Sequence, residues 1–203
     1  MIVTRIEELS RSRSRIYVDD SFAFVLYKGE LHLYGIREGE ELSRETFRKI
    51  TEEVLGQRAT RRCMELLNSR PYTEKQLRDK LVQGEYPASC IEKALAYVKS
   101  YGYVDDARYV QAYIISAQEK KSRRAMEADL LRRGVDAGLI REAFLRQEEQ
   151  GELEDEEELA RRWLKKRRFD AQNADRATIQ KTAAFLYRKG IGAETIRKVL
   201  SDA

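Results

Sequence analysis

Residues 70–77 read Arg-Pro-Tyr-Thr-Glu-Lys-Gln-Leu, and this stretch decides the fold. Pro71 ends a preceding helix, because a proline disfavours helical geometry in the residue before it. Thr73, followed three residues later by Gln76, forms a capping-box pattern, and apolar residues flank it at the positions of a hydrophobic staple. The stretch therefore predicts a helix, a tight turn and the start of a second helix.

A third helix completes the unit. The second helix runs to Gly84, and Pro87 then stands at the start of a helix that carries Ile91, Leu95 and Val98 on one face. The same order of elements is predicted twice more along the chain. In the second copy, Asp105 or Asp106 opens the first helix and Ser122 opens the second; in the third copy, Thr178 opens the second.

The copies share a spacing. A glycine ends each second helix, an isoleucine follows after 7, 6 and 6 residues, and a bulky apolar residue stands four positions later. The three sets are Gly84, Ile91 and Leu95; Gly134, Ile140 and Phe144; and Gly190, Ile196 and Leu200. These linked offsets favour a tandem repeat. The extra residue in the first copy leaves the orientation of its third helix open.

The first 42 residues differ from the rest. They are rich in β-branched and aromatic residues, as in the run Phe22–Tyr27, and turn-forming clusters at 19–21 and 28–30 interrupt them. They predict a small antiparallel sheet of three or four strands that packs on a neighbouring helix, with His32 in a strand. Ser43 then caps a helix that Gly56 interrupts.

The predicted fold is mainly α: three tandem three-helix repeats in an elongated, curved array behind a small antiparallel β-rich segment. The predicted boundaries are 1–42 for the β-rich extension, 43–58 for a linking helix, 59–104 for repeat 1, 105–147 for repeat 2, 148–158 for an acidic hinge and 159–203 for repeat 3. Hydrophobic residues make up 42% and charged residues 36% of the chain, a balance that suits such an array because it keeps more surface per residue than a sphere.

Composition excludes several classes. No window approaches the roughly 18 uninterrupted apolar residues of a membrane span, and the first residues lack a signal-peptide pattern. We expect a cytoplasmic, monomeric protein with no membrane partner. Cys63 and Cys90 have no metal-ligand spacing and are expected to be buried thiols.

The sequence also lacks the motifs of common enzyme sites. It has no glycine-rich phosphate loop, and one histidine without a cysteine–histidine cluster disfavours zinc and histidine-assisted catalysis. Asp105 and Asp106 are better explained as a helix cap than as a metal or acid–base pair. We therefore predict no enzyme, no cofactor and no metal.

Charge is unevenly distributed. Residues 148–158 hold eight acidic and no basic side chains, whereas the three predicted repeats hold 29 basic against 16 acidic ones. The acidic block is interpreted as a flexible hinge, since like charges repel and extend a chain. A basic strip along a helical array is typical of contact with phosphate or with a nucleoprotein surface. The candidate contact residues are Arg61, Arg62, Lys120, Lys121, Arg123, Arg124, Arg132, Arg133, Arg161, Arg162, Lys165, Lys166, Arg167 and Arg168.

Several of these motifs resemble the RecX regulatory proteins of bacteria. The resemblance lies in 69–77, in 102–109 (Gly-Tyr-Val-Asp-Asp-Ala-Arg-Tyr), in 121–122 with 130–135, and in 189–191, and it covers about residues 59–200. The β-rich segment resembles the extension of longer members.

The resemblance implies three three-helix repeats that bind the RecA recombinase and its filament on single-stranded DNA. It further implies suppression of ATP hydrolysis and strand exchange, and thereby a role in DNA repair, recombination and the SOS response. Bare single-stranded DNA would be bound weakly and without sequence preference. The family offers no catalytic residues to carry over.

Two alternatives stay open at this point. Three-helix units also resemble helix-turn-helix modules, which would make the chain a DNA-binding regulator. The helical array would also serve as a passive scaffold in a larger complex.

Overall fold

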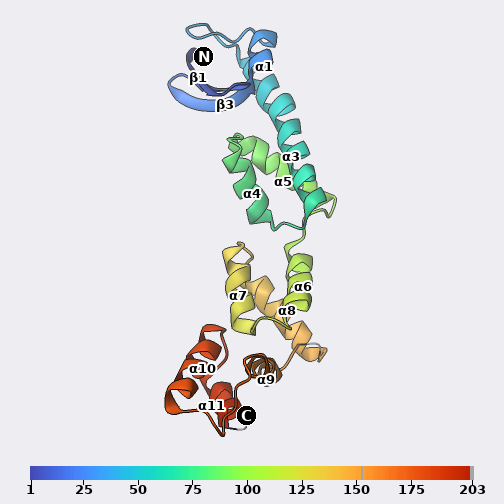
Figure 1. The fold of residues 1–203 in the computed structure, drawn as a ribbon. Coiled ribbons are helices and arrows are strands. Elements are labelled where there is room, and N and C mark those ends of the chain that lie inside the picture. Colours follow the sequence, from blue (N-terminus) through green and yellow to red (C-terminus); the bar gives the residue numbers. More distant parts are fainter. Residues whose placement is uncertain (152, 202–203) are drawn as a thin grey trace. The chain divides into compact units, whose positions relative to one another are not determined.

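The computed structural model describes residues 1–151 and 153–201, and the chain divides into two compact units, Met1–Asp105 and Asp106–Ala203. The first unit holds the N-terminal sheet and repeat 1, and the second holds repeats 2 and 3 (Figure 1). The three tandem three-helix repeats and the small antiparallel sheet are as predicted, whereas the curvature of the array stays a prediction.

The sheet has three antiparallel strands in the order β1-β2-β3, with β1 at Val3–Ser10, β2 at Arg13–Val18 and β3 at Ser21–Tyr27. The predicted turn between β2 and β3 is confirmed, since Asp19 and Asp20 both have positive φ, 47° and 63°. A two-residue hairpin turn needs this geometry because its twist then matches that of the strands, and Asp tolerates it better than most residues.

The prediction for residues 28–36 is wrong. Lys28–Leu33 form a short helix, α1, so His32 lies in a helix and the described part of the chain has no fourth strand. Lys28–Glu30 were taken for a turn, but the Glu30 carboxylate accepts a hydrogen bond from the Tyr27 backbone N–H at 2.8 Å. Such a contact satisfies a free donor at a helix start, and it therefore favours a helix over a turn.

Gly56 does not interrupt the next helix. Ser43 caps α2 (Arg44–Lys49) as predicted, and the chain then continues through a π-helical turn, η1 (Ile50–Leu55), directly into α3 (Gly56–Ser69). The Gly56 N–H reaches back to the Thr51 carbonyl, which also accepts from the Cys90 thiol at 3.1 Å. Gly56 itself has helical φ and ψ, −60° and −48°.

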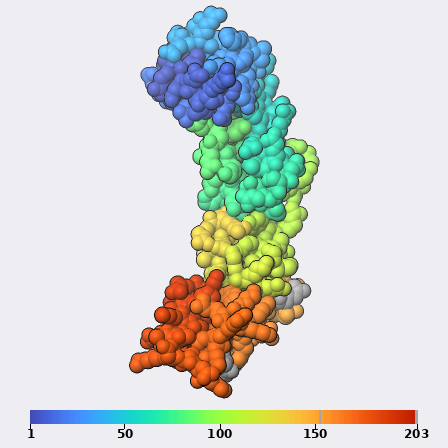
Figure 2. Space-filling model, in the orientation of Figure 1, coloured from blue at the N-terminus to red at the C-terminus, as the bar shows by residue number. Residues whose placement is uncertain are grey.

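Repeat 1 consists of α3, α4 (Glu74–Gln83) and α5 (Ala88–Ser100). The capping box is confirmed, because the Gln76 N–H donates to Thr73 Oγ1 and the Thr73 N–H donates to Gln76 Oε1, both at 3.2 Å. The sheet and repeat 1 share one core, in which Phe24 and Leu26 from β3 join residues of α3, α4 and α5. The expected packing of the sheet on a helix is thus confirmed, and its residues form one mass with the start of α3 (Figure 2).

Repeat 2 consists of α6 (Asp106–Ala117), α7 (Arg123–Arg132) and α8 (Ala137–Glu149), and repeat 3 of α9 (Glu156–Lys166), α10 (Arg176–Arg188) and α11 (Ala193–Ser201). Ser122 caps α7 as predicted. The prediction for α10 is wrong by three residues: Asp175 is its cap and accepts the N–H of Thr178 at 2.8 Å.

All three second helices end in the same way. A residue with positive φ follows the last turn, and the next N–H donates back to a fully buried leucine: Tyr86 to Leu81, Val135 to Leu130, Ile191 to Leu186. This is the Schellman closure, which satisfies carbonyls that a helix end leaves free. The residue with positive φ is Gly134 or Gly190 in the later repeats but Glu85, not Gly84, in the first. Measured from it, the buried isoleucine comes six residues later every time.

Repeats 2 and 3 meet at Gly190. The buried Ser122 hydroxyl, which caps α7, also donates to the Lys189 carbonyl at 2.7 Å. A Cβ added to Gly190 would lie 2.4 Å from that hydroxyl oxygen, so glycine is required here both for its φ of 88° and for the close approach.

We expect Gly190→Ala to lower the free energy of unfolding of the second unit by about 2 kcal/mol, from backbone strain and a lost buried hydrogen bond. Urea unfolding followed by circular dichroism measures the loss. Gly151→Ala is the matched control, because Gly151 has positive φ with open space around it and should cost only about 1 kcal/mol. Equal losses would show that the contact between Ser122 and Gly190 contributes nothing.

Candidate nucleic-acid interface

The 14 predicted contact residues separate into paired and unpaired cations. In the first unit, Arg61 and Arg62 lie on α3 and are exposed. They line a hollow of about 600 Å³ whose other wall carries Arg13 from the sheet. Arg62 forms an ion pair with Glu65 at 3.2 Å, whereas no acidic partner of Arg61 is found in the described residues.

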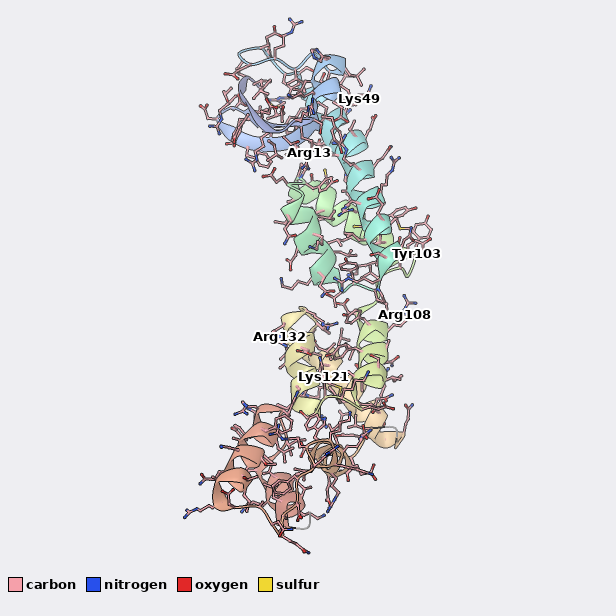
Figure 3. The ribbon with its side chains drawn as sticks, in the orientation of Figure 1. Arg13, Lys49, Tyr103, Arg108, Lys121 and Arg132 are labelled. Atoms are coloured by element: carbon pink, nitrogen blue, oxygen red, sulfur yellow. The ribbon has the colours of Figure 1, made fainter. Side chains whose placement is uncertain are left out.

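The candidates on α7 belong mostly to one internal network. Lys121 and Arg132 both pair with Asp129, whose side chain is only 14% exposed, and Tyr113 donates to the same carboxylate at 2.7 Å. Arg133 lies over the Tyr113 ring, 4.6 Å from its centre. Lys121 and Arg132, both labelled in Figure 3, thus fix α7 within repeat 2. Their charges are largely compensated.

The remaining candidates of repeat 2 differ in their pairing. Arg123 is bound by Glu127 at 2.9 Å and by Glu148. Lys120 and Arg124 are exposed, and the Arg124 guanidinium lies 5.9 Å from the ring centre of Tyr187 on α10. Only Lys120 and Arg124 therefore present a largely free positive charge on this part of the second unit.

The first turns of α9 take up the acidic block. Arg161 pairs with Glu157 at 2.8 Å, and Arg162 pairs with Glu154, whose side chain is 17% exposed. Glu157 also binds Lys198 of α11 at 2.6 Å. Hydrogen bonds from Lys198 and Arg161 hold the pKa of the Glu157 carboxyl below its usual value of 4.5.

The acidic segment is therefore not a separate linker. Glu148 and Glu149 end α8, residues 156–158 begin α9, and Glu152 lies outside the described residues. Glu156 accepts hydrogen bonds from the Gly192 N–H at 3.3 Å and the Thr195 hydroxyl at 2.8 Å, so it caps α11. Repulsion between these carboxylates is offset because each meets a donor of its own repeat.

The end of α9 carries the densest free charge. Lys165, Lys166, Arg167 and Arg168 are all exposed, and no acidic side chain pairs with them in the described part of the chain. The Arg167 guanidinium lies 4.4 Å from the centre of the Phe185 ring. Arg168 has a φ of 52° and closes the helix end in the same Schellman geometry as the second helices. The run thus projects four cations from a rigid helix end.

One exposed group escaped the sequence analysis. Tyr97, Tyr101 and Tyr103, at the end of α5, are 45%, 62% and 48% exposed, and their rings follow one another at 4.7 Å and 6.0 Å. The spacing of Tyr97 and Tyr101 by one helical turn was the available signal. Exposed tyrosines are typical of surfaces that contact a partner.

The described residues contain no group of three or more metal-ligating side chains. Helix α6 begins at Asp106, directly after Asp105, as a helix start requires. The two cysteines are free and buried, as expected, and burial raises the pKa of the Cys63 thiol to about 11, far from that of a reactive thiolate. Among the described helices, none is long and apolar enough to cross a membrane.

Fold and surface together define a tandem three-helix repeat protein with locally unpaired basic residues. Family models for the first, second and third three-helix domains of RecX match residues 59–97, 105–143 and 154–200. The chain is 30% identical to the regulatory protein RecX of Caldanaerobacter subterraneus subsp. tengcongensis over 99% of both chains. It is 27% identical to that of Clostridioides difficile, over 98% and 94%.

Solved structures agree in fold. A crystal structure of regulatory protein RecX covers 100% of this chain and 99% of its own, with a TM-score of 0.64 and 22% identity. RecX from Lactobacillus salivarius covers 73% and 96%, with a TM-score of 0.58 and 16% identity. The chain belongs to the RecX family of regulatory proteins, which is not an enzyme family.

The pairing pattern predicts which candidates are structural. We expect Arg162→Ala to destabilise the second unit by about 1–2 kcal/mol, because it leaves the largely buried Glu154 carboxylate without its partner. Lys166→Ala, which removes a charge without an acidic partner, should change stability by less than about 0.5 kcal/mol. Urea unfolding followed by circular dichroism compares them. A loss for Lys166→Ala as large as that for Arg162→Ala would contradict this division.

Proposed function

We propose that this protein regulates the RecA recombinase by binding the RecA filament on single-stranded DNA, where it lowers ATP hydrolysis and strand exchange. Membership of the RecX family supports a regulatory role. The observation that carries the nucleic-acid part is the run Lys165–Arg168, whose exposed charges have no acidic partner in the described residues. Unpaired cations are the ones that gain from displacing the counterions of a phosphate backbone.

The charge pattern favours binding without base readout. Phosphate contacts from Lys and Arg position a protein on nucleic acid but carry no sequence information. Weak, salt-dependent binding to bare single-stranded DNA follows, and the filament would supply the remaining contacts through protein. The proposal takes the protein as a monomer acting in the cytoplasm.

A helix-turn-helix regulator is the second function considered. Base readout needs Arg, Asn or Gln near the exposed start of a recognition helix. The first three residues of the third helices are Ala-Ser-Cys in α5, Ala-Gly-Leu in α8 and Ala-Glu-Thr in α11. None of them carries such a side chain, so the observations favour contact with phosphate or protein. A passive scaffold would have no effect on the recombinase.

The decisive measurement is the ATPase activity of RecA on single-stranded DNA with this protein added below the RecA concentration. We expect inhibition at substoichiometric ratios, because one bound regulator affects neighbouring subunits of a continuous filament. Unchanged activity at saturation would reject the proposal and leave the scaffold. A preferred DNA sequence in a binding assay would favour the helix-turn-helix regulator instead.

Neutralising part of the basic run tests its role. We expect Lys165→Gln with Lys166→Gln to weaken binding to single-stranded DNA and to lower the slope of log affinity against log salt by about one. Arg167 stays in place because its guanidinium packs on Phe185. Fluorescence anisotropy of a labelled oligonucleotide at several salt concentrations measures both quantities.

Arg48→Gln with Lys49→Gln is the control, since it removes the same charge from exposed residues of α2. Helicity should be unchanged in both variants. An equal loss of affinity in the control would show that net charge, rather than the run on α9, sets the affinity.

A further inference from the structure

The hollow in the first unit has two walls from distant parts of the sequence. Helices α3 and α4 supply Arg58, Arg61 and Lys80, and the sheet supplies Arg13 and Tyr27. Arg13 and Tyr27 are cross-strand partners of β2 and β3, so their side chains leave the same face of the sheet. The hollow holds about 600 Å³, which is within the size range of ligand sites.

The two walls are held together firmly. The Arg15 guanidinium, two residues along β2 from Arg13, pairs with Glu85 at the end of α4 at 2.7 Å. Both side chains are less than one-third exposed. The sheet and repeat 1 also share one core, so the hollow is a preformed feature of the unit.

Its charge is strongly positive. Five cations line it (Arg13, Arg58, Arg61, Arg62 and Lys80) against one carboxylate, Glu65. Arg62 is bound by Glu65, and Arg58 by Glu30 of α1. No carboxylate of the described chain pairs with the other three, Arg13, Arg61 and Lys80, and these are exposed. Three unpaired cations around one depression attract an anion with several negative groups.

Two tyrosines give the hollow aromatic surface. Tyr27 is 45% exposed and has the Arg58 guanidinium 4.7 Å from its ring centre. The Tyr86 ring covers Gly84 so closely that a Cβ there would lie 2.8 Å from it. Burial raises the pKa of the Tyr86 hydroxyl, so it stays neutral beside the cations. Cations interleaved with aromatic rings are typical of sites for unpaired nucleotides.

We propose that this hollow binds one or two nucleotides of single-stranded nucleic acid, with phosphates at Arg13, Arg61 and Lys80 and a base against Tyr27 or Tyr86. The inference rests on the proposed function only in that the filament would supply the strand. It gives the N-terminal sheet a role, because the sheet provides Arg13 and Tyr27. A strand fits better than a free nucleotide, since the glycine in the wall is covered by Tyr86 and no glycine-rich loop surrounds the phosphates.

The test uses the full chain and a fluorescein-labelled oligothymidylate of about ten nucleotides. We expect Arg13→Glu with Arg61→Glu to raise the Kd by on the order of tenfold or more, because two phosphate contacts become repulsive. The matched control is Arg48→Glu with Lys49→Glu, which makes the same charge change outside the hollow; Arg13 and Lys49 are both labelled in Figure 3. A loss in the control as large as in the hollow variant overturns the proposal.

Folding is checked independently, by circular dichroism and thermal unfolding. Neither Arg13 nor Arg61 has an ion pair with a described residue, so both variants should melt like the unchanged protein. If the glutamate variant unfolds, Arg13→Gln with Arg61→Gln takes its place, with a smaller rise in Kd expected. No rise in Kd for that folded variant overturns the proposal.

Location and ligand class are read separately. An oligonucleotide carrying 4-thiothymidine should crosslink on irradiation to peptides containing Tyr27 or Tyr86, and crosslinks confined to Tyr97–Tyr103 overturn the site. Adenosine monophosphate or polyglutamate that displaces the strand at equal charge concentration would assign the hollow to a free nucleotide or an acidic peptide instead. RecA ATPase inhibition is measured in parallel: its absence rejects the proposed function without touching the oligonucleotide result.

Discussion

The closure of each second helix on one left-handed residue is the constraint on which the repeats depend. The closure reverses the chain within two residues, and it places the next helix so that an isoleucine six positions later is buried against the same core. In the third repeat it also sets the junction with the second, because Gly190 admits the Ser122 hydroxyl. One backbone geometry thus determines both the inside of a repeat and one contact between repeats.

Charge is divided between holding the fold and facing outward. Asp129, Glu154, Glu156 and Glu157 each meet donors of their own unit, and partly buried carboxylates tolerate burial only with such partners. The cations left over gather at the end of α9 in the second unit and around the hollow in the first. A net charge of +4 conceals this division, because pairing removes most of the acidic block from the surface.

The N-terminal sheet is an integral part of the first unit. Three strands are too few to be stable alone, and the sheet gains stability from the core it shares with repeat 1 and from the pair between Arg15 and Glu85. That pair also explains the exception in the repeat pattern. Glu85 adopts the left-handed geometry that glycine adopts elsewhere, and its carboxylate is held by the sheet. The strain and the ion pair offset each other at one residue.

The sequence alone determined what depends on neighbouring residues: the capping box at Thr73, the cap at Ser122, the turn at Asp19 and Asp20, and the count of three repeats. Local hydrogen bonds and periodic burial leave their signature within a few residues. Only the tertiary structure decided that 28–33 is a helix, that α3 continues through Gly56, and which of the 14 candidate cations are paired. It also brought Arg13 to Arg61, 48 residues away, across a hollow. These outcomes depend on partners distant in sequence, and residue spacing carries no information about such partners.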